Sequence, residues 1–241
     1  MTPVHTTLLI PCYNEVDGIP HLCARLREVV PQISSNGGVE VLFVDDGSTD
    51  GTAEAIRNEA NGLSFRVIAH RSNRGLGAAL RTGFGESQGS EVVTLDSDCT
   101  YDPLQALNLL TALRQGNDVV TGSPYHPRGE VIDVVPWRLF VSKTLSYIYW
   151  AVLPVRLFTY TSCFRAYRRD VLAHLDAGDD GFLGVTQLLV SAILRGYRVA
   201  EIPSKLTSRR FGRSKIRTFQ VALSHLKYIG TVVGMRLTGK R

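Results

Sequence analysis

Residues 42–52 read LFVDDGSTDGT, an apolar run that stops at two adjacent carboxylates, Asp45 and Asp46. The run 41–44 has the length and the β-branched content of a buried strand. The Gly-Ser-Thr-Asp-Gly sequence that follows favours a turn, and Thr52 opens a segment of helical length. A buried strand followed by charged residues, a turn and a helix is typical of one repeat of a strand–helix–strand protein.

Short apolar runs and helical segments continue to alternate through the first half of the chain. This alternation predicts βαβ units and a mostly parallel sheet that is buried on both faces. The fold class that we expect is therefore α/β, with a central sheet and flanking helices. The predicted strands are 7–10, 39–44, 65–69, 92–95 and 119–121, and the predicted helices are 19–33, 52–60, 75–87 and 104–114.

Polar and acidic side chains follow three of the predicted strands. The first strand ends in PCYNE and the second in DDGS, and the fourth ends in DSDC, with Asp96 and Asp98 one residue apart. Ligands of parallel sheets bind at the carboxyl ends of the strands. Asp and Asn also favour turns and caps, so each motif alone is weak evidence for a site. Their occurrence at three strand ends favours a binding site over turn chemistry.

The spacing of Asp96 and Asp98 allows one or both to hold a hard divalent cation through carboxylate oxygen. A cation on a parallel sheet, beside Tyr13 and further acidic groups, indicates a nucleotide diphosphate as the ligand. A divalent cation, together with Arg or Lys, neutralises the negative charge of a diphosphate. We therefore expect Mg²⁺ or Mn²⁺ as the cofactor.

The composition bounds the size of the protein and the chemistry of its partners. With 241 residues, of which 44% are hydrophobic, the chain can bury the core of one domain, with or without an extension. Residues 1–194 carry 15 basic and 21 acidic side chains, a net charge of −6, whereas residues 195–241 carry 12 and 1, a net charge of +11. This asymmetry indicates an anionic partner, namely nucleic acid, a phospholipid surface or a phosphorylated ligand, and the alternative is a solvated basic face.

Several classes of protein are disfavoured by the motifs that the chain lacks. No N-terminal stretch combines basic, apolar and small-residue cleavage regions, so we expect a cytoplasmic protein. The cysteines form no C-x-x-C pair, which favours reduced thiols over a zinc site or a disulfide framework. The first strand leads into PCYNE instead of G-x-G-x-x-G, which disfavours a dinucleotide-dependent oxidoreductase. A nucleic-acid-binding module would not explain three acidic strand ends, so we expect no nucleic acid partner.

Seven motifs follow one another in a specific order and spacing: IPCYNE, VDDGSTDGT, NRGLGAALRTGF, LDSDCTYDP, GSPY, TSCFRAYRRDVL and RRFGRSK. Together they resemble the inverting glycosyltransferases of family 2, which have the GT-A fold. The branch that they look most like is that of the dolichyl- and polyprenyl-phosphate mannosyltransferases and their glucosyl relatives. The resemblance runs from about Thr6 to Lys227, and it is much more specific for the family and the fold than for the sugar.

The resemblance implies a donor site at the strand ends and in the RRFGRSK motif. In such enzymes residues of the first two motifs surround the base and the ribose, and the serine between the two aspartates lies against the nucleotide. Basic residues of the last motif close over the diphosphate or the acceptor phosphate. The implied nucleotide-sugar-binding residues are Pro11, Tyr13, Glu15, Val44, Asp46, Ser97, Asp98, Arg209 and Lys215.

The resemblance also implies the metal ligands and the catalytic residues. Asp96 and Asp98 match the metal and diphosphate motif of the family, and Thr100 stands where relatives use a glutamine. Arg165, in the SCFRAYR segment, is implied to lie next to the acceptor. The metal set is thus Asp96, Asp98 and Thr100, and the catalytic set is Asp96, Asp98 and Arg165.

Two departures from the family pattern bear on the acceptor. A hydroxyl acceptor needs a general base, whereas a phosphate monoester is largely ionised at neutral pH because its second pKa is about 6. Many family members carry a glutamate where this chain has Gln187, and mannosyltransferase relatives often carry an aspartate where it has Thr159. We therefore expect transfer of mannose or glucose from GDP-mannose or a UDP-sugar to a polyprenyl or dolichyl phosphate. A hydroxyl acceptor on a polysaccharide, glycolipid or protein is the alternative.

A lipid acceptor requires contact with a membrane, although no apolar run reaches the roughly 20 residues that cross a bilayer. Segment 136–158 has the aromatic content and the basic flanks of a helix that lies on a membrane surface, and the segment that begins at residue 216 is amphipathic. Either helix could instead pack on the core. We expect a peripheral protein at the cytoplasmic face of a membrane, held there by these helices or by a membrane partner protein. The expected organisation is a GT-A domain over 1–215, with a nucleotide-sugar half at 1–122 and an acceptor half at 123–215, and a basic amphipathic extension at 216–241.

Overall fold

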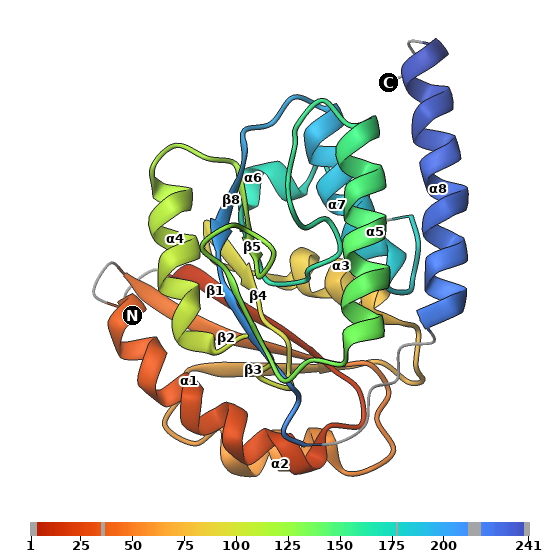
Figure 1. Ribbon diagram of the computed structural model, residues 1–241. Coiled ribbons are helices and arrows are strands. Elements are labelled where there is room, and N and C mark those ends of the chain that lie inside the picture. Colours follow the sequence, from red (N-terminus) through yellow and green to blue (C-terminus); the bar gives the residue numbers. More distant parts are fainter. Residues whose placement is uncertain (1–3, 35–36, 177, 212–217, 239–241) are drawn as a thin grey trace.

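A seven-stranded sheet forms the centre of the computed structural model, which describes residues 4–34, 37–176, 178–211 and 218–238 (Figure 1). The strands of this sheet are β1 (Val4–Cys12), β2 (Gly38–Asp45), β3 (Phe65–Ala69), β4 (Glu91–Thr94), β5 (Val119–Ser123), β7 (Arg165–Arg168) and β8 (Val199–Pro203). Their order is β3-β2-β1-β4-β7-β5-β8, and β7 alone in this sheet runs antiparallel to its neighbours. A separate parallel pair is formed by β6 (Glu130–Ile132) and β9 (Lys205–Thr207).

Helices cover both faces of the sheet. The longer helices are α1 (Ile19–Ser34), α2 (Thr52–Glu59), α3 (Leu76–Glu86), α4 (Ala106–Arg114), α5 (Pro136–Val152), α7 (Leu183–Leu194) and α8 (Thr218–Thr238). Three short helical turns complete the described elements: η1 (Val16–Gly18), η2 (Pro103–Gln105) and α6 (Arg169–Leu172).

Alternate side chains of the central strands enter different hydrophobic clusters. In β2, Val41 and Phe43 pack in the cluster that contains α1 and α4, whereas Leu42 and Val44 pack in the cluster that contains α3 and α7. Both faces of the strand are therefore buried, which explains why its sequence is an apolar run without alternation. The predicted α/β fold with a mostly parallel central sheet is confirmed.

All five strands and all four helices predicted for the first half lie within or overlap observed elements. The antiparallel strand β7 was not predicted. It pairs with both β4 and β5 and so joins strands β3, β2, β1 and β4 to strands β5 and β8. The four cysteines are free thiols in the structure, which agrees with the prediction of reduced cysteines.

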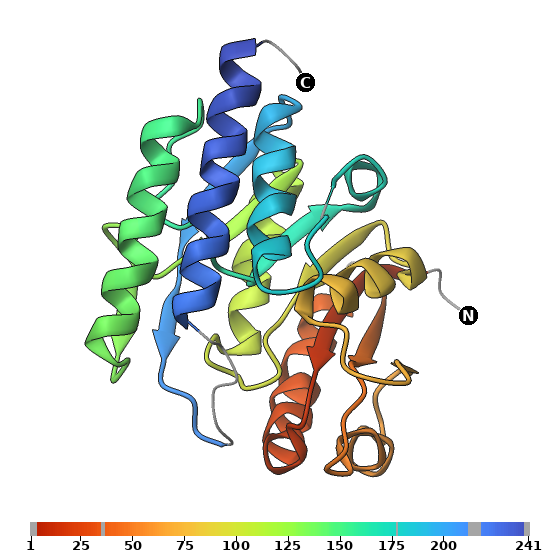
Figure 2. The same cartoon turned by 90° about the vertical axis from the view of Figure 1, so that its right-hand side faces the viewer.

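Helix α8 packs between α5 and α7 (Figure 2). Its buried residues His225, Ile229 and Val232 recur at helical spacing, and Ile229 and Val232 share a cluster with Tyr149 of α5. The predicted extension at 216–241 therefore contains a helix that packs into the core beside α5 and α7. Its outer side also carries apolar residues, since Phe219 and Leu237 are 76% and 82% exposed.

Candidate active site

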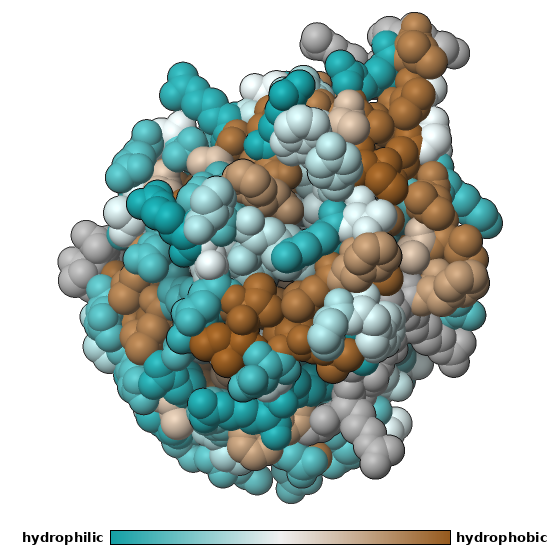
Figure 3. All heavy atoms as spheres, in the orientation of Figure 1, coloured by the Kyte–Doolittle hydropathy of each residue, from teal (hydrophilic) through white to brown (hydrophobic). Residues whose placement is uncertain are grey.

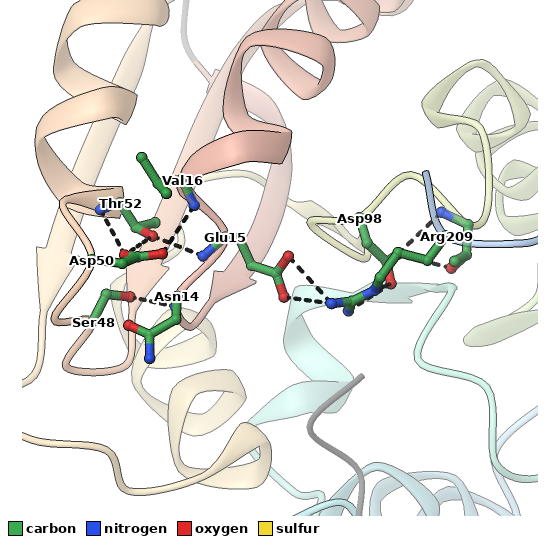
Figure 4. Close-up of polar contacts among 9 residues, drawn as sticks. Asn14, Glu15, Val16, Ser48, Asp50, Thr52, Asp98 and Arg209 are labelled. Carbon is green, nitrogen blue, oxygen red and sulfur yellow. Dashed lines mark hydrogen bonds and ion pairs between the residues drawn. The ribbon is translucent and has the colours of Figure 1, made fainter. Parts of the chain in front are cut away.

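Hydrogen bonds join the loop after β1 to the loop after β2. The backbone N–H of Asn14 donates to Ser48 Oγ at 2.8 Å, and Asn14 Oδ1 accepts from the Thr49 N–H at 2.8 Å. The N–H of Glu15 donates to Thr52 Oγ1 at 2.8 Å. Because the loops are fixed to each other in this way, the side chains of Glu15 and its neighbours are held at the carboxyl edge of the sheet (Figure 4).

Arg209 lies between acidic residues from two strand ends. Its NH1 nitrogen is 3.1 Å from Glu15 Oε1, which follows β1, and its Nε and NH2 nitrogens are 2.9 and 2.8 Å from Asp98 Oδ2, which follows β4. Figure 4 shows the guanidinium directed at both carboxylates. Arg209 therefore lies at the acidic strand ends, and its contact with a diphosphate or an acceptor phosphate stays a prediction.

Thr100 is bonded to Asp98. Its backbone N–H and its hydroxyl donate to Asp98 Oδ1 at 3.1 and 2.9 Å, so Thr100 orients the carboxylate that the sequence predicts to bind metal. A direct bond from Thr100 to a cation, which the sequence analysis expected, stays a prediction.

Asp96, Asp98 and Glu15 concentrate negative charge around Arg209. Burial, together with the charge of Asp98, raises the pKa of Asp96 to about 7. A divalent cation would relieve this excess of negative charge, so the residues fit one. No three acidic, histidine or cysteine side chains within the described ranges converge as a complete metal site. Two carboxylates suffice for Mg²⁺ when substrate phosphates and water supply the remaining oxygens.

Asp46 is buried and accepts several hydrogen bonds. Oδ1 lies 2.6 Å from His70 Nδ1 and 3.0 Å from the Arg74 N–H, and Oδ2 accepts from the Gly75 N–H at 2.7 Å. His70 Nε2 is in turn 2.9 Å from Thr82 Oγ1. The Asp46 carboxylate thus orders the turn that leads into α3. Recognition of a base by Asp46 stays a prediction, and it would use the remaining acceptor capacity of this carboxylate.

The side chain of Arg165 lies in the core, and the expectation that it lies next to the acceptor stays a prediction. Its side chain is fully buried, and its guanidinium donates to the carbonyls of Val185 and Tyr160 and to Thr121 Oγ1. These bonds tie β7 to α7 and to the segment before β7. The Arg165 guanidinium is therefore directed into the core and away from solvent, where its hydrogen bonds hold these segments together.

The remaining predicted donor residues lie at or just after the carboxyl ends of the first, second and fourth strands. Pro11 and Val44 are paired neighbours at the carboxyl ends of β1 and β2, and both are buried. Tyr13 follows β1 and is half-buried, and Ser97 is buried between Asp96 and Asp98. Lys215 lies outside the described residues.

A polar network borders the opposite half of the same edge, where β5 ends. Ser123 Oγ is 2.6 Å from Thr159 Oγ1, and both oxygens of Glu201 accept backbone N–H groups, from Phe158 at 2.9 Å and from Thr159 at 2.8 Å. Gln187 Oε1 accepts from the N–H of Asp179 at 2.7 Å. Gln187, Thr159 and Glu201 are thus occupied in holding loops.

The basic side chain of Lys143, on α5, lies near this network. Lys143 Nζ is 5.1 Å from the ring centre of Tyr125, which closely follows β5, and Ser142 is 2.9 Å from Thr161 Oγ1. The buried Nε of Arg138 has no hydrogen-bond partner within the part of the chain that the structure describes. A buried nitrogen that lacks an acceptor favours an anion at this position.

Sequence reasoning missed His70 and Glu201. His70 directly follows β3, at the same edge as the acidic residues, and this position was a usable signal. Glu201 lies within β8, a strand that the sequence analysis did not predict, so no local pattern placed it at the site.

A mostly parallel sheet with acidic residues at the ends of β1, β2 and β4, and a D-x-D pair bonded to an arginine, is the arrangement expected of a glycosyltransferase of the GT-A fold. The chain belongs to glycosyl transferase family 2, whose sequence profile matches residues 7–176.

Two curated relatives align over most of the chain. The polyprenol monophosphomannose synthase of Mycolicibacterium smegmatis is 37% identical over 220 residues, which are 88% of this chain and 80% of that protein. The undecaprenyl-phosphate mannosyltransferase of Micrococcus luteus is 33% identical over 215 residues, which are 86% of each chain.

Solved structures share the fold. The glucosyl-3-phosphoglycerate synthase of Mycobacterium tuberculosis, in complex with Mn²⁺, uridine diphosphate and phosphoglyceric acid, has a TM-score of 0.72 and 20% identity. The match covers 94% of this chain and 78% of that one. A structure of the same enzyme with Mg²⁺ and uridine diphosphate has a TM-score of 0.71, also at 20% identity, and covers 94% of this chain and 79% of that one. At this identity the likeness supports the GT-A fold alone.

Proposed function

We propose that this enzyme transfers a hexose, mannose or glucose, from a nucleoside-diphosphate sugar to a polyprenyl phosphate. The observation that carries the proposal is the similarity to two polyprenyl-phosphate mannosyltransferases over more than 85% of the chain. The donor is GDP-mannose or a UDP-sugar, bound at the carboxyl edge of β1, β2 and β4.

On the donor side, Tyr13, Glu15 and Asp46 contact the base and the ribose. Asp98, oriented by Thr100, and Asp96 hold the divalent cation. When bound, Mg²⁺ or Mn²⁺ neutralises charge that develops on the leaving diphosphate. The guanidinium of Arg209 places a further positive charge beside the diphosphate oxygens, since a guanidinium binds phosphate in a bidentate geometry.

The acceptor enters from the side of β5 and α5. Its phosphate oxygen attacks the anomeric carbon while the bond from that carbon to the diphosphate oxygen breaks, with inversion. A phosphate monoester needs no general base, because it is already largely ionised at neutral pH. This agrees with the surroundings, where Glu201 already accepts one backbone N–H on each oxygen and where Gln187 replaces an acid. The positive charges of Arg138 and Lys143 favour binding of the anionic acceptor.

Membrane contact is made by the outer sides of α5 and α8. Trp137, Phe140 and Tyr147 of α5 and Phe219 and Leu226 of α8 are at least half exposed, and hydrophobic side chains gather along α8 in Figure 3. None of the helices within the described ranges has the length and the apolar character of a membrane span. Apolar and aromatic side chains beside basic ones are typical of helices that lie in the membrane interface. The face of the membrane that the enzyme contacts is the cytoplasmic one, where nucleotide sugars are available.

The test compares two acceptors that differ only in the phosphate. The purified enzyme is incubated with Mn²⁺, with radiolabelled GDP-mannose or UDP-glucose, and with either undecaprenyl phosphate or undecaprenol in detergent. We expect label in the lipid only with undecaprenyl phosphate. Transfer to a hydroxyl acceptor, with none to the lipid phosphate, would overturn the proposal and favour a hydroxyl-directed family 2 enzyme.

A further inference from the structure

Residues 208–211, which follow β9 and are called the crossing segment below, lie at the carboxyl edge of the sheet and bring a positive charge to it. Phe211 packs at 5.9 Å between ring centres against His21 of α1, and its Cβ lies near Gly18. Two residues earlier in the chain, Arg209 reaches Glu15 and Asp98. The crossing segment is therefore held at two points, by an apolar contact at Phe211 and by ion pairs at Arg209.

Arg209 and Thr100 together use both oxygens of Asp98. Oδ1 accepts from Thr100, and Oδ2 faces two nitrogens of the Arg209 guanidinium. The ion pairs are largely shielded from water, since the side chains of Arg209, Asp98 and Glu15 are 23%, 13% and 7% exposed. A cation that binds Asp98 needs the lone pairs that Arg209 now faces, so the two compete for the same carboxylate.

We infer that Arg209 holds the place of the divalent cation in the enzyme without ligands, and leaves Asp98 only when a nucleotide diphosphate offers it new oxygen partners. This inference rests on the proposed donor site. It assigns Arg209 two successive partners, the carboxylates in the free enzyme and the diphosphate in the complex. Metal and nucleotide then bind as a coupled pair, because each makes the other's site available.

The fraction of molecules in which Arg209 is paired with Asp98 determines how much this pairing weakens the binding of Mn²⁺. A ligand that binds only the minor state of a protein has an affinity that is reduced by the population of that state. If Arg209 is paired with Asp98 in about 90–99% of molecules, free Mn²⁺ binds about 10 to 100 times more weakly than it would to an open site. The diphosphate removes this penalty, since phosphate oxygens match the fork of the guanidinium.

Binding of Mn²⁺, followed by electron paramagnetic resonance and by calorimetry, tests the inference without any measurement of sugar transfer. The variants are Arg209→Gln and, as the matched control, Arg210→Gln, which removes an exposed charge from the next position. We expect Arg209→Gln to bind MnCl₂ alone at least tenfold more tightly than the wild type, and Arg210→Gln to remain within about twofold of it. In the wild type, GDP or UDP should strengthen Mn²⁺ binding at least tenfold, and this coupling should shrink in Arg209→Gln.

A second substitution localises the gain to Asp98. In the Arg209→Gln background, Asp98→Asn should return Mn²⁺ affinity to the wild-type value or below. If the gain persists without the Asp98 carboxylate, the cation binds elsewhere and the inference is wrong. It is also wrong if folded Arg209→Gln binds Mn²⁺ no more tightly than the wild type, or if Arg210→Gln gains as much, because loss of any positive charge would then explain the effect.

Should Arg209→Gln fail to fold, Phe211→Ala decides the question. This change removes the apolar contact of the crossing segment and leaves every carboxylate in place, so it should strengthen binding of MnCl₂ alone by a smaller factor. Unchanged affinity in Phe211→Ala would then overturn the inference. None of these titrations involves an acceptor, so a failure of the proposed transfer to polyprenyl phosphate is recognised separately in the acceptor comparison.

Discussion

Asp98 and Arg209 are 111 residues apart in sequence, yet the NH2 nitrogen of Arg209 lies 2.8 Å from Asp98 Oδ2. This ion pair places the basic segment after β9 over the acidic strand ends of the first half. One positive charge of the C-terminal fifth, that of Arg209, thus lies within the candidate site.

Asp98→Asn should lower the rate of sugar transfer by at least about 100-fold, because a neutral amide binds a divalent cation weakly and leaves the departing diphosphate without part of its neutralisation. Steady-state kinetics with Mn²⁺ measures the loss. The fold should persist, as shown by a circular dichroism spectrum like that of the wild type. Asp170→Asn, an exposed carboxylate outside the site, serves as the control and should keep full activity. Near-normal transfer in Asp98→Asn would contradict the metal assignment.

Asp46→Asn should weaken binding of the donor far more than binding of the acceptor. The new amide nitrogen faces at least one hydrogen-bond donor among His70 and the N–H groups of Arg74 and Gly75, so the turn before α3 loses order. Loss of a buried hydrogen bond to a charged group costs about 1.5–3 kcal/mol of stability. Urea unfolding measures that loss of stability, and calorimetry with GDP and UDP measures the affinity for the donor nucleotide. An equal loss of affinity for donor and acceptor would indicate a structural role alone.

Glu201→Gln should raise the KM for the acceptor several-fold while the KM for the donor stays unchanged. One oxygen that accepts a backbone N–H from Phe158 or Thr159 becomes an N–H donor, and the loop that borders the acceptor side shifts. Initial rates over a range of polyprenyl phosphate concentrations give this KM. Glu130→Gln is the matched control, since Glu130 pairs with Lys205 at the surface. A parallel rise in both KM values would place the effect on the whole fold.

Replacement of both Phe219 and Leu226 by serine should reduce association with anionic phospholipid vesicles by at least about tenfold. Each side chain is at least half exposed on α8, and burial of such a side chain contributes about 1.5–3 kcal/mol. Co-sedimentation with vesicles measures the association. The midpoint of thermal unfolding should change little, because exposed side chains contribute little to stability. Thr231→Ala, exposed on the same helix, is the control, and undiminished association of the double variant would exclude α8 as the contact.

Stability should fall in mild acid because of His225. Burial lowers the pKa of His225 to about 4 from an ordinary value of 6.5, and Asp179 opposes this shift weakly. The folded state disfavours the protonated imidazole, so this contribution to stability is fully present above pH 6.5 and is lost as the pH falls toward 4. The loss between pH 7 and pH 5 should be about 2 kcal/mol.

Urea unfolding of the wild type and of His225→Gln at the two pH values tests this account. The glutamine retains a polar partner for Tyr149, whose hydroxyl is 3.0 Å from His225 Nδ1, but it does not titrate. Its stability should therefore depend less on pH than that of the wild type, by about the same 2 kcal/mol. Identical pH dependence in the two proteins would assign the acid sensitivity to other groups.

Local sequence was sufficient to predict the strands in the first half of the sheet. Strands buried on both faces require apolar runs, so 39–44 and 92–95 were recognisable without any partner, and polar residues directly after such runs must lie at one edge of a parallel sheet. This reasoning placed Asp46, Asp96 and Asp98 together at the carboxyl edge, where the structure has them. Helix α8 was recognisable as amphipathic for the same reason, since helical periodicity is a local property.

The structure alone decided the features that depend on contacts between distant segments. The strand β7 has only four residues and runs antiparallel, and no periodicity marks it. The burial of Arg165 and its hydrogen bonds to the carbonyls of Tyr160 and Val185 could not be predicted, because a sequence motif does not reveal which groups a guanidinium will meet in the folded chain.

Helix α8 shows most clearly which features the sequence determines and which the tertiary structure determines. Its sequence determined that it would have an apolar stripe, but the tertiary structure decided that His225, Ile229 and Val232 pack on α5 and α7 while Phe219, Leu226 and Leu237 remain exposed. A pattern of apolar residues favours burial of a face, because removal of apolar surface from water is favourable but not directional, yet much of the apolar surface of α8 is exposed. Which surface covers that face depends on the shape and position of neighbouring elements, and these exist only once the chain has folded.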